Sequence, residues 1–92
     1  MTIYPERSFL RAFKKLADFD QKTVDAAIAQ LPAVIGKPHE HRGASVRRLK
    51  AGIFELRAGL RLRVVFTFSK EVAILWTVGD HDHIRAWLRG IK

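Results

Sequence analysis

Residues 53–79 read IFELRAGLRLRVVFTFSKEVAILWTVG, and this stretch predicts the centre of a β-sheet. Its first part alternates apolar and polar side chains, whereas its last part is almost wholly apolar, as in a strand covered on both faces. Gly79 ends the apolar run. Three strands are expected at residues 53–57, 60–68 and 72–78, with a tight Ala58-Gly59 turn and a second turn at residues 69–71.

Alternation in the first two strands separates two faces of the predicted sheet. The face expected to cover the core carries Phe54, Leu56, Leu60, Leu62, Val64, Phe66 and Phe68. The open face carries Glu55, Arg57, Arg61 and Arg63. Three arginines gathered there repel one another, with only Glu55 to compensate. A phosphate backbone would relieve that repulsion, because guanidinium binds phosphate in a bidentate manner. The alternative is an ordinary solvent-facing hairpin.

The N-terminal half is expected to supply two helices that cover the apolar face. Ser8 is a candidate N-cap for the first helix, and apolar side chains recur after it at helical spacing. The second helix is expected to begin at Asp20 and to stop where Pro32 interrupts it. The apolar positions of the two helices are Phe9, Phe13, Leu16 and Ala17, followed by Val24, Ala27, Ile28 and Leu31.

Three further segments complete the predicted order of elements. Residues 2–4 are β-prone and stop at Pro5, which suits a short strand near a sheet edge. Residues 33–52 are expected to form a loop with a basic run at residues 47–50, and residues 82–91 a last short helix. The predicted fold is therefore α+β in the order β-α-α-β-β-β-α, with an antiparallel sheet packed against a helical hairpin and a short C-terminal helix.

Length and composition predict a single domain over residues 1–92, with 48% hydrophobic residues and no repeat or linker. The chain has no cysteine, so neither a disulfide framework nor a thiolate zinc site is available. No stretch approaches the roughly 20 apolar residues of a membrane span, and the start lacks the apolar segment of a signal peptide. We therefore expect a cytoplasmic protein with no membrane partner.

The charge predicts a polyanionic partner. The formal net charge is +8 and the sequence pI about 10.7. Residues 1–40 hold six Lys/Arg against five Asp/Glu, a net of +1, whereas residues 41–92 hold eleven against four, a net of +7. Such segregation favours a binding site for nucleic acid or an acidic protein over a uniformly solvated basic surface.

A second feature is Gly79-Asp80-His81-Asp82-His83, directly after the most apolar strand. A strand end beside a glycine can aim side chains from a rigid element while leaving them accessible. Imidazole exchanges protons readily near neutral pH. Beside a carboxylate and near arginines, His81 or His83 could therefore move a proton at a phosphodiester.

Two other interpretations of this segment stay open. The Asp-His-Asp-His run, together with His39 and His41, supplies metal-binding atoms, but no spacing matches a strong metal motif. We expect no metal and no other cofactor. The run could also be a polar loop that caps the last helix through Asp80 or Asp82.

The run Glu55-Leu56-Arg57, a glycine turn, Arg63-Val64-Val65-Phe66 and a strand ending in Val78-Gly79 resembles the RelE/ParE toxin superfamily across essentially the whole chain. The resemblance implies a toxin of a type II toxin–antitoxin system. Members of the RelE branch are mRNA interferases: they cleave mRNA in the ribosomal A site without a metal and so inhibit translation. Their endoribonuclease reaction leaves a 2′,3′-cyclic phosphate and a 5′-hydroxyl end. An acidic antitoxin that wraps the toxin in a hetero-oligomer holds them inactive.

Carried over by position, the resemblance assigns the sheet arginine of the family to Arg63, with Arg61 as the nearby alternative. Its role would be to neutralise charge that builds on the phosphate in the transition state. His81 takes the position of general acid or base, and His83 is the alternative for proton transfer. The family's basic residues before the hairpin correspond loosely to Arg48 and Lys50, which would bind backbone phosphates.

The last helix departs from the family pattern, because Trp87 stands where many relatives have a tyrosine. An indole can stack on a base but has no hydroxyl to exchange a proton, so the acid–base role would fall on the histidines. Arg57, Arg85 and Arg89 are further candidate contacts to RNA.

Three alternatives to RNA cleavage remain at this point. The ParE branch of the same superfamily inhibits DNA gyrase, and it would not need a histidine beside an arginine-rich face. A non-catalytic RNA-binding or ribosome-associated domain would use the same basic sheet, although exposed aromatics for stacking are missing from its open face. The loss of the tyrosine makes an inactive toxin relative the third alternative.

Overall fold

The computed structural model describes residues 1–36 and 45–90. Its elements follow the order β1 (Thr2–Pro5), α1 (Arg7–Lys14), α2 (Asp18–Gly36), β2 (Val46–Lys50), β3 (Ile53–Ala58), β4 (Leu62–Ser69), β5 (Val72–Gly79) and α3 (His81–Arg89). The α+β class and the helical hairpin expected from the sequence are confirmed. No helix in the described ranges is long and apolar enough to cross a membrane.

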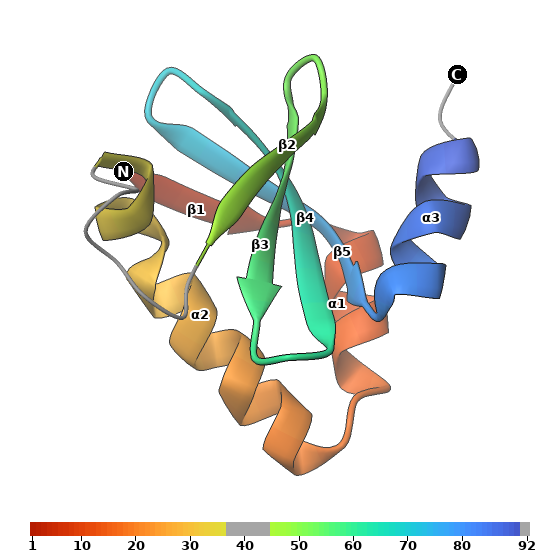
Figure 1. Ribbon diagram of the computed structural model, residues 1–92. Coiled ribbons are helices and arrows are strands. Elements are labelled where there is room, and N and C mark those ends of the chain that lie inside the picture. The colour runs from red at the N-terminus through yellow and green to blue at the C-terminus, as the bar shows by residue number, and fades with distance from the viewer. Residues whose placement is uncertain (37–44, 91–92) are drawn as a thin grey trace.

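The strands form one sheet in the spatial order β1-β5-β4-β3-β2 (Figure 1). Neighbouring strands are antiparallel except at one edge, where β1 runs parallel to β5. The long strands β4 and β5 therefore lie at the centre. The candidate catalytic residues Arg63 and His81 lie at the start of β4 and just after the end of β5.

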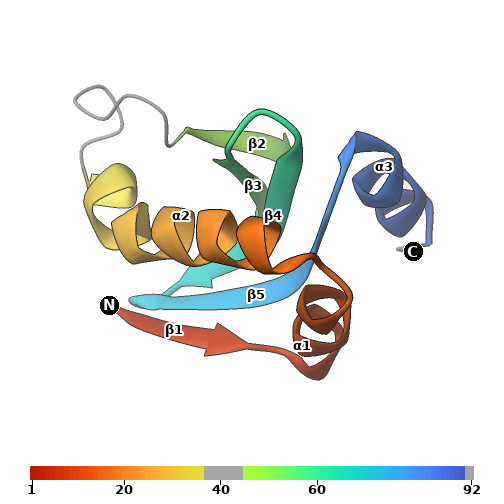
Figure 2. The same ribbon diagram turned by 90° about the horizontal axis from the view of Figure 1, so that it is seen from below.

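Helices α1 and α2 cover one face of the sheet, with α1 against β5 and α2 against β3 and β4, while α3 lies against the ends of β4 and β5 (Figure 2). The core lies beneath α1 and α2. Phe54 stacks on its cross-strand partner Phe66 at 5.6 Å between ring centroids, on the face predicted to be apolar. Buried side chains of this core include Phe9, Val24, Leu31, Leu56, Leu62, Val64 and Phe66.

Residues 46–50 form the edge strand β2, so the prediction of a loop over residues 33–52 was wrong there. The polar pattern concealed the strand: Val46 and Leu49 are half-buried, while Arg47, Arg48 and Lys50 are exposed. Charged side chains are common on edge strands, because they discourage pairing with other chains.

Helix α2 is longer than predicted at both ends, since it begins at Asp18 and passes through Pro32 to Gly36. Proline removes a backbone hydrogen bond from a helix interior. Leu31 and Val34 on either side of Pro32 are fully buried, however, and burial of two such side chains offsets that loss.

The β3–β4 turn occupies residues 59–61 rather than Ala58-Gly59, because Ala58 pairs with Leu62 across the hairpin. Gly59 adopts a positive φ of 66°, which a glycine tolerates without strain. Leu60, predicted for the core, is 96% exposed at the tip of this turn. Arg61 is part of this turn and therefore does not lie on the open face of the sheet.

The helix ends differ in detail from the prediction. Glu6 is the N-cap of α1 and makes no side-chain capping bond, so the assignment of Ser8 was wrong. The Ser8 hydroxyl instead donates to the carbonyl oxygen of Trp76 at 2.5 Å, which ties α1 to β5. Asp80 is the N-cap of α3, one of the two caps expected, and α3 begins at His81 rather than residue 82.

Candidate functional site

Arg63 lies near the start of β4, where the strand is flanked by β3 and β5. Its register partners are Arg57 on β3 and Gly79 on β5. Paired residues share a face of the sheet, so Arg63 has a second arginine on one side and no side chain on the other. Its side chain is only 14% exposed. Arg63 is therefore held by the sheet, and on the β5 side the ring of His83 occupies the space above Gly79.

Glu55 is the counter-charge that keeps Arg63 in place. Its Oε1 lies 3.5 Å from Nε of Arg63 and 3.1 Å from Nη2 of Arg47. The adjacent strands β2, β3 and β4 thus contribute one charged residue each, and the buried anion Glu55 lies between the cations Arg47 and Arg63. Arg63 Nε is buried and has no hydrogen-bond partner among the described residues, so the contact with Glu55 is an ion pair without hydrogen-bond geometry.

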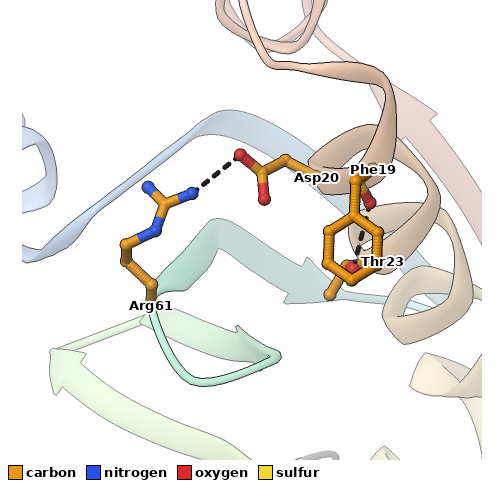
Figure 3. A network of polar contacts seen from close by, with 4 residues as sticks. All are labelled: Phe19, Asp20, Thr23 and Arg61. Atoms are coloured by element: carbon orange, nitrogen blue, oxygen red, sulfur yellow. Dashed lines mark hydrogen bonds and ion pairs between the residues drawn. The ribbon is translucent and has the colours of Figure 1, made fainter.

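Arg61 is held differently, in the exposed turn between β3 and β4. Its Nη2 donates to Oδ2 of Asp20 at 2.7 Å, and its side chain is 62% exposed (Figure 3). The expectation that Arg61 would share the open face with Glu55 and Arg63 was wrong. Residue 61 belongs to the rim of the sheet and is paired to the start of α2.

The two histidines occupy the first turn of α3 and not a free loop. The backbone N–H of His83 donates to Oδ1 of Asp80 at 2.9 Å. Its ring Nε2 lies 2.8 Å from the hydroxyl oxygen of Thr77, a buried residue of β5. His81 is exposed and makes no side-chain hydrogen bond to another described residue. The ring of His83 is therefore tethered to the sheet, whereas that of His81 is available.

Gly79 makes this arrangement sterically feasible. A Cβ atom placed on residue 79 would lie 2.6 Å from two ring carbons of His83. No side chain other than hydrogen fits without moving the first turn of α3. The prediction that Gly79 ends the apolar strand is confirmed, because Gly79 is the last residue of β5.

A shallow hollow of about 300 Å³ collects the candidate chemical groups, and we call it the Arg63 hollow. It is lined by Leu60, Arg61, Arg63, Asp80, His81 and Asp82. Two arginines and the histidine with an available ring therefore line one hollow. His83 lies outside it and lines a neighbouring groove with residues of α1.

The remaining predicted RNA contacts are dispersed. Arg48 borders an apolar hollow on the core side of the sheet, with Val34 and Phe66 among its neighbours. Trp87 lines a separate hollow together with Ile53, Thr67 and Trp76. The others are exposed: Lys50 at the end of β2, Arg57 beside Arg63, and Arg85 and Arg89 on α3.

Among the described residues, no three or more His, Cys, Asp or Glu side chains lie close enough together to hold a metal ion. His39 and His41 lie outside the described residues.

Sequence reasoning missed two residues that position the site. Thr77 holds His83, and its signal was a single polar residue in an otherwise apolar strand. Asp20 holds Arg61 across a separation of 41 residues, for which no local pattern gave a signal.

No protein-family model matches this chain, and no curated protein matches it by sequence. Solved structures do share its fold. A copper-bound mutant toxin from Helicobacter pylori has a TM-score of 0.72 at 20% identity, covering 91% of this chain and 98% of that one. RelE in a RelB–RelE antitoxin–toxin complex from Methanococcus jannaschii gives 0.66 at 12% identity, with 91% and 96% covered. YoeB from Staphylococcus aureus, solved as a dimer, gives 0.65 at 17% identity, with 88% and 97% covered. At such identities the similarity establishes the fold, which confirms the architecture that the sequence resemblance implied.

Proposed function

We propose that this chain, which has the fold of RelE-type toxins, is the toxin of a type II toxin–antitoxin pair and an endoribonuclease that cleaves mRNA on the ribosome without a metal ion. The observation that carries the proposal is the Arg63 hollow, where a sheet-anchored arginine and an available histidine meet. The net charge of +8 supports a polyanionic substrate.

In this proposal Arg63 stabilises the phosphate as negative charge builds on its non-bridging oxygens. The contact with Glu55 is made by Nε. Four further N–H donors on the terminal nitrogens of a guanidinium remain for the phosphate. A buried ion pair fixes the group before substrate arrives, so little reorganisation is required in the transition state. Arg61, on the rim of the same hollow, binds the substrate rather than the reacting group.

His81 is the group that we assign to proton transfer. In the proposed step the 2′-hydroxyl oxygen attacks the adjacent phosphorus and loses its proton, while the bond from phosphorus to the 5′-oxygen breaks and that oxygen gains a proton. The products are a 2′,3′-cyclic phosphate and a 5′-hydroxyl end. The imidazole of His81 either takes the first proton or gives the second. His83 is assigned a positioning role, because its ring is already bonded to Thr77.

The proposed protein partner is an acidic antitoxin that forms a hetero-oligomer with this chain. A charge of +8 would accelerate association with a negatively charged chain by electrostatic steering. The association rate of such a complex should therefore fall steeply as salt is added. A rate independent of salt would contradict an electrostatically steered partner.

The deciding experiment is a translation reaction on a defined mRNA with the purified chain added, in which new 5′ ends are mapped by primer extension. Parallel reactions omit ribosomes, and ribosome-free RNA is also tested with EDTA. Codon-phased cuts only with ribosomes are the expected result. Cuts on free RNA that EDTA abolishes would instead indicate a metal nuclease.

Binding without cleavage is the second candidate, and one observation favours it. Glu55 lies between Arg47 and Arg63 and neutralises part of their charge. A hollow with a compensated arginine can hold a phosphate without accelerating a reaction on it. Complete absence of cuts in the translation reaction would favour this function, and a DNA supercoiling assay would then test inhibition of gyrase.

A further inference from the structure

A second hollow lies on the α1 side of Asp80, and we call it the α1 groove. It has a volume of about 490 Å³ and runs between the last turn of α1 and the start of α3. Its charged lining residues are Arg11, Lys15, Arg61 and Asp80, and His83 also lines it. Nothing in the proposed cleavage step uses Arg11 or Lys15.

The α1 groove adjoins the Arg63 hollow. Arg61 and Asp80 line both, so the two depressions meet along a ridge formed by these residues. A linear polymer bound in one hollow can therefore continue into the other while staying in contact with the protein surface. This adjacency distinguishes the groove from basic side chains elsewhere on the protein.

The charges that face the groove are predominantly positive. Arg11 and Lys15 lie one helical turn apart, both exposed, and neither forms an ion pair with another described residue. Two carboxylates lie close by. Asp20 pairs with Arg61, whereas Asp80 accepts from the backbone of His83 and keeps its negative charge, against the three cations Arg11, Lys15 and Arg61. Cations in the last turn of a helix also stabilise the helix dipole, an effect that needs no groove.

We propose that the α1 groove binds the phosphate backbone of the RNA nucleotides that flank the scissile phosphate, an inference that rests on the proposed function. Arg11 and Lys15 contact the flanking phosphates, and Arg61 on the ridge exchanges Asp20 for a phosphate as the strand crosses. The groove thereby fixes the path of the strand and leaves the reacting phosphate beside Arg63 and His81.

The test measures binding, so that it does not depend on cleavage. Fluorescence anisotropy compares a dinucleotide with a single strand of about eight nucleotides, both 2′-O-methylated to remove the nucleophile. The variant is R11Q/K15Q. The matched control is R7Q/K14Q, which removes the same charge from exposed positions of α1 outside the groove. Circular dichroism verifies that both variants are folded.

For R11Q/K15Q we expect loss of most of the affinity gained by lengthening the strand, and a salt dependence of log Kd shallower by about 1.4, because each phosphate contact to a single strand contributes roughly 0.7. The control R7Q/K14Q should keep most of the affinity gained with strand length and most of the salt dependence of log Kd. Equal losses in the two variants, or no loss in R11Q/K15Q, would overturn the groove assignment. The translation reaction described above tests the proposed function separately. If the unmodified protein cuts mRNA and R11Q/K15Q binds the long strand as tightly as the unmodified protein does, the groove assignment is refuted and the proposed function stands.

Discussion

The floor and the rim of the Arg63 hollow each present one arginine, and the two are supported in opposite ways. Arg63 on the floor is 14% exposed, belongs to β4 and faces a buried glutamate. Arg61 on the rim is 62% exposed, belongs to a turn and pairs with Asp20 of α2. Both ion pairs join an arginine to a carboxylate, but only the first is enclosed by the sheet.

The difference in burial indicates a difference in role. An exposed ion pair contributes roughly 0.2–1 kcal/mol and can be exchanged for a phosphate at little cost. Removing one partner of a buried pair costs about 3–5 kcal/mol, because the other charge is left uncompensated. Arg63 is thus suited to a fixed position in the transition state, and Arg61 to a contact that changes when RNA binds.

The largest effect is expected when the floor arginine is removed. Arg63→Ala should lower the rate of ribosome-dependent cleavage by about 10²–10³-fold, the range observed when one oxyanion-stabilising donor is lost. Initial rates from end mapping give the measurement. Because Glu55 loses a partner, thermal unfolding must show that the variant is folded under assay conditions. A folded Arg63→Ala chain that cleaves normally would contradict the proposed role.

The two histidines sharpen the same contrast between available and tethered groups. His81→Ala should lower cleavage by about 10²-fold, the lower end for general acid–base catalysis. His83→Ala should act chiefly on stability, by about 1 kcal/mol, through loss of the contact with Thr77. Cleavage rates and urea denaturation curves of both variants give the comparison. A reversed pattern would move the proton-transfer role to His83.

Glu55→Gln tests whether the floor arginine depends on its buried partner. The amide keeps the shape but removes the charge that faces Arg47 and Arg63. We expect kcat to fall by roughly 10-fold with KM little changed, the pattern of an interaction made only in the transition state. Glu71→Gln is the matched control, since Glu71 is exposed in the β4–β5 turn. If Glu55→Gln raises KM alone, the glutamate does not position Arg63 for catalysis.

The smallest effect is expected on the rim. Asp20→Ala releases Arg61 from its ion pair and should change the free energy of unfolding by less than about 1 kcal/mol. Affinity for single-stranded RNA should rise slightly, because Arg61 no longer has to leave a carboxylate. Anisotropy titration at low salt is the measurement. Weaker binding by Asp20→Ala would mean that the ion pair holds Arg61 in its binding position.

The sequence predicted the floor of the site better than its rim. Alternation correctly grouped Glu55 with Arg57, and it grouped Arg63 with them only because the turn is longer than predicted. With residues 59–61 in the turn, Arg57 pairs with Arg63, whereas a turn at residues 58–59 would have paired Arg57 with Leu60. Arg61 was misplaced because Ala-Gly is compatible with turns of different length, and one extra residue changes which side chains reach the sheet. Leu60 added to the error, since its apolar character matched the predicted core face although it is exposed.

Contacts between distant segments were the other source of error. The pairing of Asp20 with Arg61 joins the start of α2 to a turn and leaves no periodic signal. Strand β2 escaped notice because its charged residues resemble a loop, although β3 pairs with it. The Asp80 cap, by contrast, was available from the sequence, because aspartate before a helix is a local signal.

One measurement tests the central claim, that the floor arginine acts on the reacting phosphate and the rim arginine only binds. It is the determination of kcat and KM for Arg63→Lys and Arg61→Lys on ribosomes programmed with one mRNA. Both substitutions conserve charge, but lysine cannot reproduce the planar guanidinium. We predict that Arg63→Lys lowers kcat at least about 10-fold with KM nearly constant, and that Arg61→Lys leaves kcat unchanged. Equal effects of the two substitutions on kcat, or a larger effect of Arg61→Lys, would contradict the account.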